Sequence, residues 1–379
     1  MITTLTPDTA LLSTLDAALS RARPHGSRQV AELGDWLINN LPEHLSCVID
    51  TAGNIHIDAR TEQHHRTLFI AHLDTVHRSS GTNKIVKTQA KWQAGSKGQC
   101  LGADDGAGVA MLMHLMWHGV PGYYVFSQGE ECGGIGARFL SDYSDATLLE
   151  HDRAVAFDRR GIDSVITHQS TGRCCSDEFA QALATALNTA SSEELFLAPD
   201  DTGIYTDTAE FTSQIPECTN ISIGYEQAHS DQEWLDMYYI QTRADAAVKI
   251  DWDALPTKRD PQQVEDDGYA YGGNWSKWDW GAVSQAVPGA GSKAVAVGNY
   301  SKEMQLEEAL DDAYLGILSP LIDMICEHVY PEDPSIARKQ MNRNLISDEA
   351  VLAWAEEELF NQTPVEHILD SLFEGAQVH

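Results

Sequence analysis

Four short apolar runs constrain the fold of this chain more than any other feature. They are TLFIAHLDTV (67–76), GYYVFSQGEE (122–131), AVAFDRR (154–160) and TNISIGYE (219–226). Each has the length and apolar content of a buried strand, and helical segments lie between them. Strands that alternate with helices predict an α/β domain built on a largely parallel central sheet.

The other segments carry signals of helices and turns. Apolar residues recur near helical spacing from Val30 to Leu41, and Ser176 is placed to cap a helix. Gly53-Asn54 lies between two short strand-like segments and predicts a hairpin. We expect helices at 7–22, 26–41, 108–119 and 176–188.

The apolar runs bring polar side chains to their carboxyl ends. His72 and Asp74 lie at the end of the first run, Glu130 and Glu131 end the second, and Asp158 lies near the end of the third. Sites in open α/β sheets form in the crevice beyond the carboxyl ends of the strands. We therefore expect these side chains to converge in space.

Two further motifs complete a candidate ligand set for two metal ions. Asp104 lies with Asp105 in the glycine-rich turn GADDGAG (102–108), and His229 lies in GYEQAHSDQE (224–233). Two imidazoles and three carboxylates form a mixed nitrogen and oxygen set that suits zinc, cobalt or manganese. The expected ligands are His72, Asp104, Glu131, Asp158 and His229.

Each motif also has an ordinary interpretation when it is considered alone. A histidine near an aspartate is common at protein surfaces. Asp104 has the residue type of a helix cap or an Asp-Gly turn, and a pair of glutamates is often solvated. Asp158 could pair with Arg159 or Arg160. The metal-site interpretation depends on the order of all the motifs together.

The remaining acidic residues have expected supporting roles. A carboxylate has two oxygens, so Asp104 can bridge two cations, and Asp105 is expected to support it. We also expect an unusual backbone conformation at this pair of aspartates, even a cis peptide. Asp74 is placed to hold the second ring nitrogen of His72. Glu130 has no metal of its own and is expected to act as general base and acid, taking a proton from the attacking water and passing it to the leaving nitrogen.

Taken together, the motifs resemble those of the co-catalytic zinc exopeptidases, a superfamily of aminopeptidases, carboxypeptidases and peptidase T-like tripeptidases. The segments HLDTV, GADDGAG and GEECGGIGA carry the resemblance, which covers residues 26–245. It implies a three-layer α/β sandwich with a mixed, largely parallel central sheet and a pair of bound zinc ions.

The resemblance also implies how the ligands are shared between the two metals. Residues matching His72 and Asp158 hold one ion, residues matching Glu131 and His229 hold the other, and Asp104 bridges them. Glu130 falls on the position of the catalytic carboxylate of that superfamily. Asp74 falls on the position of the supporting one.

The chain departs from many members of the superfamily between its fourth and fifth ligands. Asp158 and His229 are only 71 positions apart, which leaves no room for a separate lid domain of ordinary size. The chain therefore resembles the branch without a lid. The segment TDTAEF (206–211) contains Asp207, which is interpreted either as a loop carboxylate or as an anchor for the amino group of a substrate.

The character of the sequence changes after about residue 250. We expect a catalytic domain over 1–250, an irregular connection rich in Gly, Asp, Tyr and Trp over 251–300, and a helical addition over 301–379. Within that addition, helices are expected at 301–329 and 347–374. The Trp and Tyr cluster at 269–280 is interpreted as ordinary core, as a cover for the cleft or as a subunit contact.

Composition excludes several classes of partner. The net charge of −32, from 57 acidic and 25 basic residues, repels nucleic acids and anionic membranes. No apolar run is long enough to span a membrane. The N-terminal segment lacks the pattern of a secretion signal, and the seven cysteines are odd in number and scattered. We expect reduced thiols and a cytoplasmic location.

These observations predict an exopeptidase that hydrolyses small peptides with two divalent metal ions, most simply an aminopeptidase. An N-acyl amino acid amidohydrolase using the same metal site is the alternative among enzymes. A non-catalytic binding or scaffold protein is the alternative from another class, which the presence of Glu130 beside a full ligand set disfavours. The sequence leaves the oligomeric state and the substrate side chain open.

Overall fold

The computed structural model describes residues 5–263, apart from 63, 144, 170–171 and 192–195, together with isolated positions nearer the C-terminus. The chain divides into two compact units, Met1–Ser276 and Lys277–His379. The aromatic cluster at 269–280 lies outside the described residues, as do nearly all residues of the helices predicted at 301–329 and 347–374.

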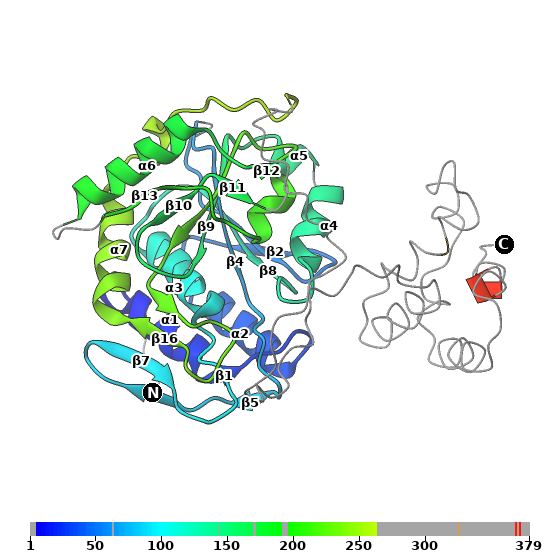
Figure 1. Ribbon diagram of the computed structural model, residues 1–379, viewed down its shortest axis with the longest axis vertical. Coiled ribbons are helices and arrows are strands. Elements are labelled where there is room, and N and C mark those ends of the chain that lie inside the picture. The colour runs from blue at the N-terminus through cyan, green and yellow to red at the C-terminus, as the bar shows by residue number, and fades with distance from the viewer. Residues whose placement is uncertain are drawn as a thin grey trace, which may run out of the picture. The chain divides into compact units, whose positions relative to one another are not determined.

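An eight-stranded sheet forms the centre of the first unit (Figure 1). Its order is β13 (Ala198–Asp200), β10 (Ser164–Ile166), β14 (Glu217–Ser222), β9 (Arg153–Arg159), β4 (Thr67–His72), β8 (Tyr123–Ser127), β3 (Ile55–Asp58) and β2 (Cys47–Ile49). The central strands β14, β9, β4 and β8 are parallel to one another. Strands β10, β3 and β2 pair antiparallel with β14, β8 and β3, respectively, so the sheet is mixed with a parallel centre, as predicted.

Helices cover both faces of this sheet and make the unit a three-layer sandwich (Figure 1). One layer contains α1 (Pro7–Leu19), α2 (Arg28–Asn39), α3 (Ala103–Trp117), α6 (Asp177–Ala190) and α7 (Met237–Lys249). The other contains α4 (Ile135–Tyr143), α5 (Asp145–Leu148) and the 3-10 helix η1 (Asp207–Phe211).

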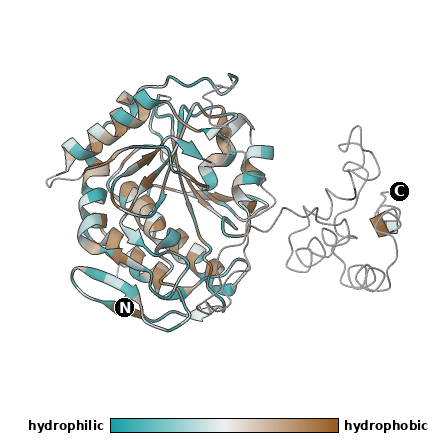
Figure 2. Ribbon diagram, in the orientation of Figure 1, coloured by the Kyte–Doolittle hydropathy of each residue, from teal (hydrophilic) through white to brown (hydrophobic). Residues whose placement is uncertain are grey.

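Strand β4 shows why the sheet is buried on both sides. Phe69 and Ala71 pack in the core that includes α1 and α3, whereas Leu68 and Ile70 pack in the core of the opposite layer. Because alternate side chains of a strand point to opposite faces, a strand covered on both sides is apolar throughout. Figure 2 shows this pattern, with mostly hydrophobic strands in the central sheet and a mixture of hydrophilic and hydrophobic residues along the surrounding helices.

Local signals fix the helix starts close to the predicted positions. Thr6 forms a capping box before Pro7, Ser27 accepts a hydrogen bond from Val30 N, and Ser176 accepts one from Phe179 N. The first helix ends earlier than predicted, because the chain then forms the short strand β1 (Arg21–Ala22).

Small sheets and hairpins complete the unit. Strand β1 pairs with β5 (Gly81–Thr82), and β11 (His168–Gln169) pairs with β12 (Gly172–Arg173). A four-stranded antiparallel sheet has the order β15 (Tyr225–Glu226), β16 (Trp234–Asp236), β7 (Lys91–Ala94) and β6 (Ile85–Lys87). Within the described part of the chain, no helix is both long and apolar enough to cross a membrane.

The residues just beyond position 250 pack into this unit. The 3-10 helix η2 (Trp252–Ala254) buries the ring of Trp252, whose centroid lies 4.9 Å from that of Phe69 in an edge-to-face contact and 6.3 Å from that of Phe157. Arg153 donates hydrogen bonds to the Trp252 and Leu255 carbonyl oxygens at 2.9 and 3.2 Å. A division of the chain at residue 250 would separate Trp252 from this core.

We therefore expect Trp252→Ala to lower the free energy of unfolding by about 3–5 kcal/mol, the usual cost of deleting a buried aromatic side chain. Urea denaturation followed by far-UV circular dichroism measures it. Phe196→Ala is the matched control, because the Phe196 side chain is 72% exposed and its loss should change stability by less than ~0.5 kcal/mol. Equal effects of the two substitutions would contradict the assigned packing.

Candidate metal centre

The five expected ligands meet at one edge of the central sheet. His72 is the last residue of β4, and Asp158 lies near the end of β9. Glu131 lies in the loop after β8, and Asp104 lies at the start of α3. Because β4, β8 and β9 are parallel neighbours, their carboxyl ends coincide, and the β15–β16 loop brings His229 to the same place.

Asp104 lies between the two histidines. Its Oδ1 is 3.2 Å from His72 Nε2, and its Oδ2 is 3.2 Å from His229 Nε2. One carboxylate thus faces a different imidazole with each oxygen. Burial raises the pKa of Asp104, but the hydrogen bonds to His229 and His72 outweigh burial and leave that pKa well below its ordinary value.

The other carboxylates complete a cluster around each imidazole. Asp158 Oδ1 and Glu130 Oε2 each lie 3.8 Å from His72 Nε2. Glu131 Oε1 lies 3.2 Å from His229 Nε2. Donor atoms within 4.8 Å of one another form three groups of three residues: His72, Asp105 and Asp158; His72, Glu130 and Glu131; and Asp104, Glu131 and His229.

The charge at this edge fits bound cations. Burial and mutual repulsion raise the pKa values of Asp105, Glu130, Glu131 and Asp158 above their ordinary ranges. Burial lowers the pKa of His229, but the carboxylates of Asp104 and Glu131 beside its ring raise it to about 11. The tightly grouped acidic oxygens and imidazole nitrogens are the donor set expected of divalent transition-metal ions.

One oxygen of Glu131 gives a direct test of that fit. Glu131 Oε1 is buried and has no hydrogen bond of good geometry, although His229 Nε2 lies close to it. A buried carboxylate oxygen without a hydrogen bond is costly unless a cation lies against it. The residues present therefore fit a metal ion beside Glu131 and His229.

Asp74 connects two of the strand ends. The Nδ1 atom of His72 lies 3.1 Å from the Asp74 carbonyl oxygen and 3.6 Å from the Asp74 Oδ1 atom. The same carboxylate accepts hydrogen bonds from the backbone N–H groups of Gly129, Glu130 and Glu131 at 2.8, 3.2 and 3.2 Å. Asp74 therefore fixes both the His72 ring and the loop that carries the two glutamates.

Asp105 supports the turn on the other side of the cluster. The peptide bond between Asp104 and Asp105 is cis, one of the unusual conformations considered for this position. The Asp105 carboxylate accepts hydrogen bonds from His72 N at 3.2 Å and from Gly108 N at 3.0 Å. The regular part of α3 begins after Asp105, since Asp104 and Asp105 both have non-helical backbone angles.

Asp158 is held by hydroxyl groups that the sequence motifs did not single out. Tyr225 donates a hydrogen bond to Asp158 Oδ1 at 3.1 Å, and Thr206 donates one to Asp158 Oδ2 at 2.8 Å. Arg159 instead donates to both oxygens of Thr202, so it is not the partner of Asp158. Both hydroxyls lie in segments quoted in the sequence analysis, but they are 48 and 67 positions from Asp158, and no local pattern indicates that they contact it.

Glu233 is the most informative residue that the sequence analysis missed. Its carboxylate accepts four backbone hydrogen bonds, from Leu101, Gly102, Ala103 and Asp104, at 2.7, 2.8, 2.8 and 3.1 Å. This one side chain holds the turn that presents Asp104. Glu233 is the last residue of the GYEQAHSDQE motif. Its only signal in the sequence was that it is acidic and that the glycine-rich turn offers free backbone N–H groups to a carboxylate.

Arg23 supplies a buried positive charge behind the same turn. Its guanidinium donates to the Leu73 carbonyl oxygen at 2.8 Å and to the Gly102 carbonyl oxygen at 3.3 Å. Burial lowers the pKa of Arg23 to about 10, although the surrounding acidic groups, among them Asp74 and Asp105, act in the opposite direction. Arg23 remains charged at neutral pH and links the end of β4 to the start of α3.

Of the two remaining residues, His229 is half exposed and Asp207 is buried. His229 has a φ of 64°, a left-handed conformation that His, Asn and Asp adopt more readily than most residues, and its side chain is 46% exposed. Asp207 is buried in η1, where Ser127 donates a hydrogen bond to its Oδ2 atom and its Oδ1 atom lacks a partner. Burial raises the pKa of Asp207 to about 6, and its role toward a substrate stays a prediction.

Comparison with solved structures identifies the fold of the unit. The aminopeptidase PepT from Bacillus cereus ATCC 10987 superposes with a TM-score of 0.50 at 12% identity, over 65% of this chain and 98% of that chain. An aminopeptidase of the archaeon Desulfurococcus kamchatkensis, APDkam598, superposes with a TM-score of 0.50 at 13% identity, over 69% of this chain and 99% of that one. The described unit has the same α/β fold as these two structures. No protein-family model and no curated protein matches the sequence.

The shared fold agrees with the resemblance seen in the sequence motifs. The described residues between Asp158 and His229 form β10 to β15, α6 and η1. Strands β10, β13 and β14 all belong to the central sheet, so this interval extends the sandwich instead of building a separate domain.

We expect Glu233→Gln to weaken metal binding about 10- to 100-fold, the usual effect of removing a group that orients a ligand. The amide NH₂ group of glutamine would face backbone N–H groups, whereas the carboxylate of Glu233 accepts hydrogen bonds from them. Equilibrium dialysis with Zn²⁺ and metal analysis measure the loss. The control is Glu226→Gln, a partly exposed carboxylate of β15, which should leave binding unchanged. Wild-type affinity in Glu233→Gln would show that the turn does not need this carboxylate.

Proposed function

We propose that the chain is a metal-dependent hydrolase of peptide bonds, specifically an aminopeptidase with two zinc ions, with cobalt or manganese as alternative metals. One observation carries the proposal: the two oxygens of Asp104 face two different imidazoles at equal distances. In this proposal Asp104 is shared, His72 and Asp158 hold one ion, and Glu131 and His229 hold the other. The aminopeptidase fold and the acidic cluster beyond the strand ends support it.

When bound, the two ions supply Lewis acidity for the substrate carbonyl and for the attacking water. The chain's own residues do the rest. Asp74 and Glu233 hold the two loops that present the ligands, through seven backbone N–H groups between them. A substrate therefore meets a preformed set of donors and not a loop that must first be ordered.

Glu130 is the proposed proton carrier. Its carboxylate lies at the cluster, with Oε2 3.8 Å from His72 Nε2. Burial raises the pKa of Glu130 well above its ordinary range; His72 lowers it and the charge of Glu131 raises it further. A carboxylate whose pKa is closer to neutrality is a better general base at neutral pH. Glu130 takes the proton of the attacking water and delivers it to the nitrogen of the departing amine.

The described cysteines bear on the compartment that we propose. Five of those that the structure describes are free thiols: Cys47, Cys100, Cys174, Cys175 and Cys218. Reduced thiols persist in reducing compartments, so we place the protein in the cytoplasm.

Glu130→Gln is expected to lower kcat by at least ~10²-fold while both metal ions stay bound, because glutamine is nearly isosteric but cannot take up a proton. Steady-state kinetics on aminoacyl-p-nitroanilides and metal analysis of the same sample measure the two quantities. Glu150→Gln is the control, since Glu150 is an exposed carboxylate of the same unit. Turnover within a few-fold of wild type would exclude Glu130 as the base.

Removal of metal is expected to abolish turnover, and Zn²⁺ should restore it. Chelation followed by titration with Zn²⁺, Co²⁺ or Mn²⁺ tests this on a panel of aminoacyl-p-nitroanilides, dipeptides and N-acetyl amino acids. Turnover of the first two classes supports an aminopeptidase. Restored turnover of N-acetyl amino acids alone would identify an N-acyl amino acid amidohydrolase instead. A chain that folds, binds metal and turns over none of these would support the scaffold alternative.

A further inference from the structure

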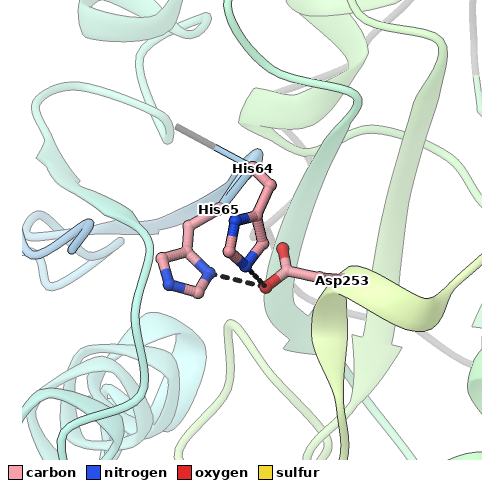
Figure 3. Close-up of side chains that lie close together, drawn as sticks. All are labelled: His64, His65 and Asp253. Atoms are coloured by element: carbon pink, nitrogen blue, oxygen red, sulfur yellow. Dashed lines mark hydrogen bonds and ion pairs between the residues drawn. The ribbon is translucent and has the colours of Figure 1, made fainter. Parts of the chain in front are cut away.

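A second group of metal-type side chains lies apart from the centre described above. It consists of His64, His65 and Asp253 (Figure 3). The two histidines belong to the connection between β3 and β4, and Asp253 belongs to η2. The metal-type motifs of the sequence did not include these residues, and the proposed function does not use them.

The geometry brings both imidazoles to one carboxylate oxygen. His65 Nδ1 lies 2.6 Å from Asp253 Oδ2, and His64 Nε2 lies 3.9 Å from the same atom. The donor atoms of all three residues lie within 4.8 Å of one another. The imidazole rings lie beside each other, with centroids 4.3 Å apart and planes tilted by 49°.

The supporting contacts orient the donors. His65 Nδ1–H donates to Asp253 Oδ2. A cation bound there would move this proton to Nε2, where Thr61 Oγ1 lies 3.1 Å away to accept it. Asp253 in turn is fixed by its backbone N–H, which donates to Asp251 Oδ1 at 3.1 Å. Metal-binding histidines usually have their second ring nitrogen held in this way.

The chemistry of the group selects a class of ligand. Two imidazoles and one carboxylate form a three-residue set of the kind that binds Zn²⁺, with bonds of about 2.0–2.2 Å and a fourth position open to water. Such bonds require donor atoms roughly 3–3.5 Å apart, and the observed separations lie on either side of that value. The His64 side chain is 66% exposed, against 12% for His65 and 23% for Asp253, so an ion can enter from solvent.

We propose that His64, His65 and Asp253 form a peripheral site for one divalent transition-metal ion of the zinc class. The ion joins residues that are 188 positions apart in the chain. It fastens η2 to the β3–β4 connection, next to the point where Trp252 enters the core against Phe69. Its role is structural, because it clamps the segment through which the chain leaves α7. The proposal does not depend on the proposed hydrolase activity.

The test compares bound metal in the full chain and in variants of this cluster. Wild type, His64→Ala and Asp253→Asn are dialysed against Zn²⁺, and bound zinc per chain is measured by mass spectrometry. Each variant is expected to bind one ion fewer than wild type. His44→Ala, which removes another exposed histidine, should bind as many ions as wild type. Equal stoichiometry in wild type and His64→Ala would overturn the proposal and leave an ordinary histidine–aspartate ion pair.

Two further measurements test this metal site independently of the proposed hydrolase activity. Cu²⁺ added to wild type should give an electron paramagnetic resonance signal with imidazole nitrogen couplings that His64→Ala alters and His44→Ala does not. At zinc concentrations about 100 times the dissociation constant, the Tm of wild type should rise by roughly 5 °C more than that of His64→Ala. Equal shifts would show that no ion clamps η2. Peptidase turnover is not read in either measurement.

Discussion

Buried negative charge is the constraint around which this molecule is organised. Asp104, Asp105, Glu130, Glu131 and Asp158 are gathered where three parallel strands end, out of bulk water. Desolvation and like-charge repulsion both oppose ionisation of such a group. Asp74, Asp105 and Glu233 are stabilised by hydrogen bonds from backbone N–H groups and by the buried positive charge of Arg23. Asp104, Glu130 and Glu131 lie against the imidazoles of His72 and His229. Acidic oxygens grouped in this way make this edge of the sheet suited to cations.

The sequence predicts the parts of this arrangement that depend on local pattern. Apolar runs ending at His72, Glu131 and Asp158 indicate parallel strands with a common polar edge, because burial on both faces requires uniformly apolar strands. The position of Ser176 likewise predicts a helix start, since a hydroxyl there satisfies a free backbone N–H. The five residues that meet at this edge could be named from order and type alone, and their role as metal ligands stays a proposal.

What the sequence could not predict depends on contacts between distant segments. Glu233 holds the turn before Asp104, and Tyr225 and Thr206 hold Asp158. An acid or a hydroxyl considered alone in the sequence has many ordinary explanations. The same is true of Trp252, whose burial against Phe69 is decided by packing and not by any periodic pattern. We expected the catalytic domain to end at residue 250, but contacts with its core continue beyond that position. They reach Arg259, whose backbone N–H donates a hydrogen bond to Glu217. Sequence composition changes there, but the core does not end there.

The hydrogen bonds that Glu233 accepts also have a consequence for the order in which parts of the protein fold. The turn at 101–104 is closed by a side chain about 130 positions later, and contacts of such long separation form late in folding. While the chain is being made, every segment up to β14 can emerge and pair before this carboxylate exists. His229, the last of the proposed ligands, and Glu233, which holds the turn before Asp104, therefore leave the ribosome almost together. A partly synthesised chain lacks both residues, so under the proposed function it would hold no complete metal centre and would not cleave neighbouring chains.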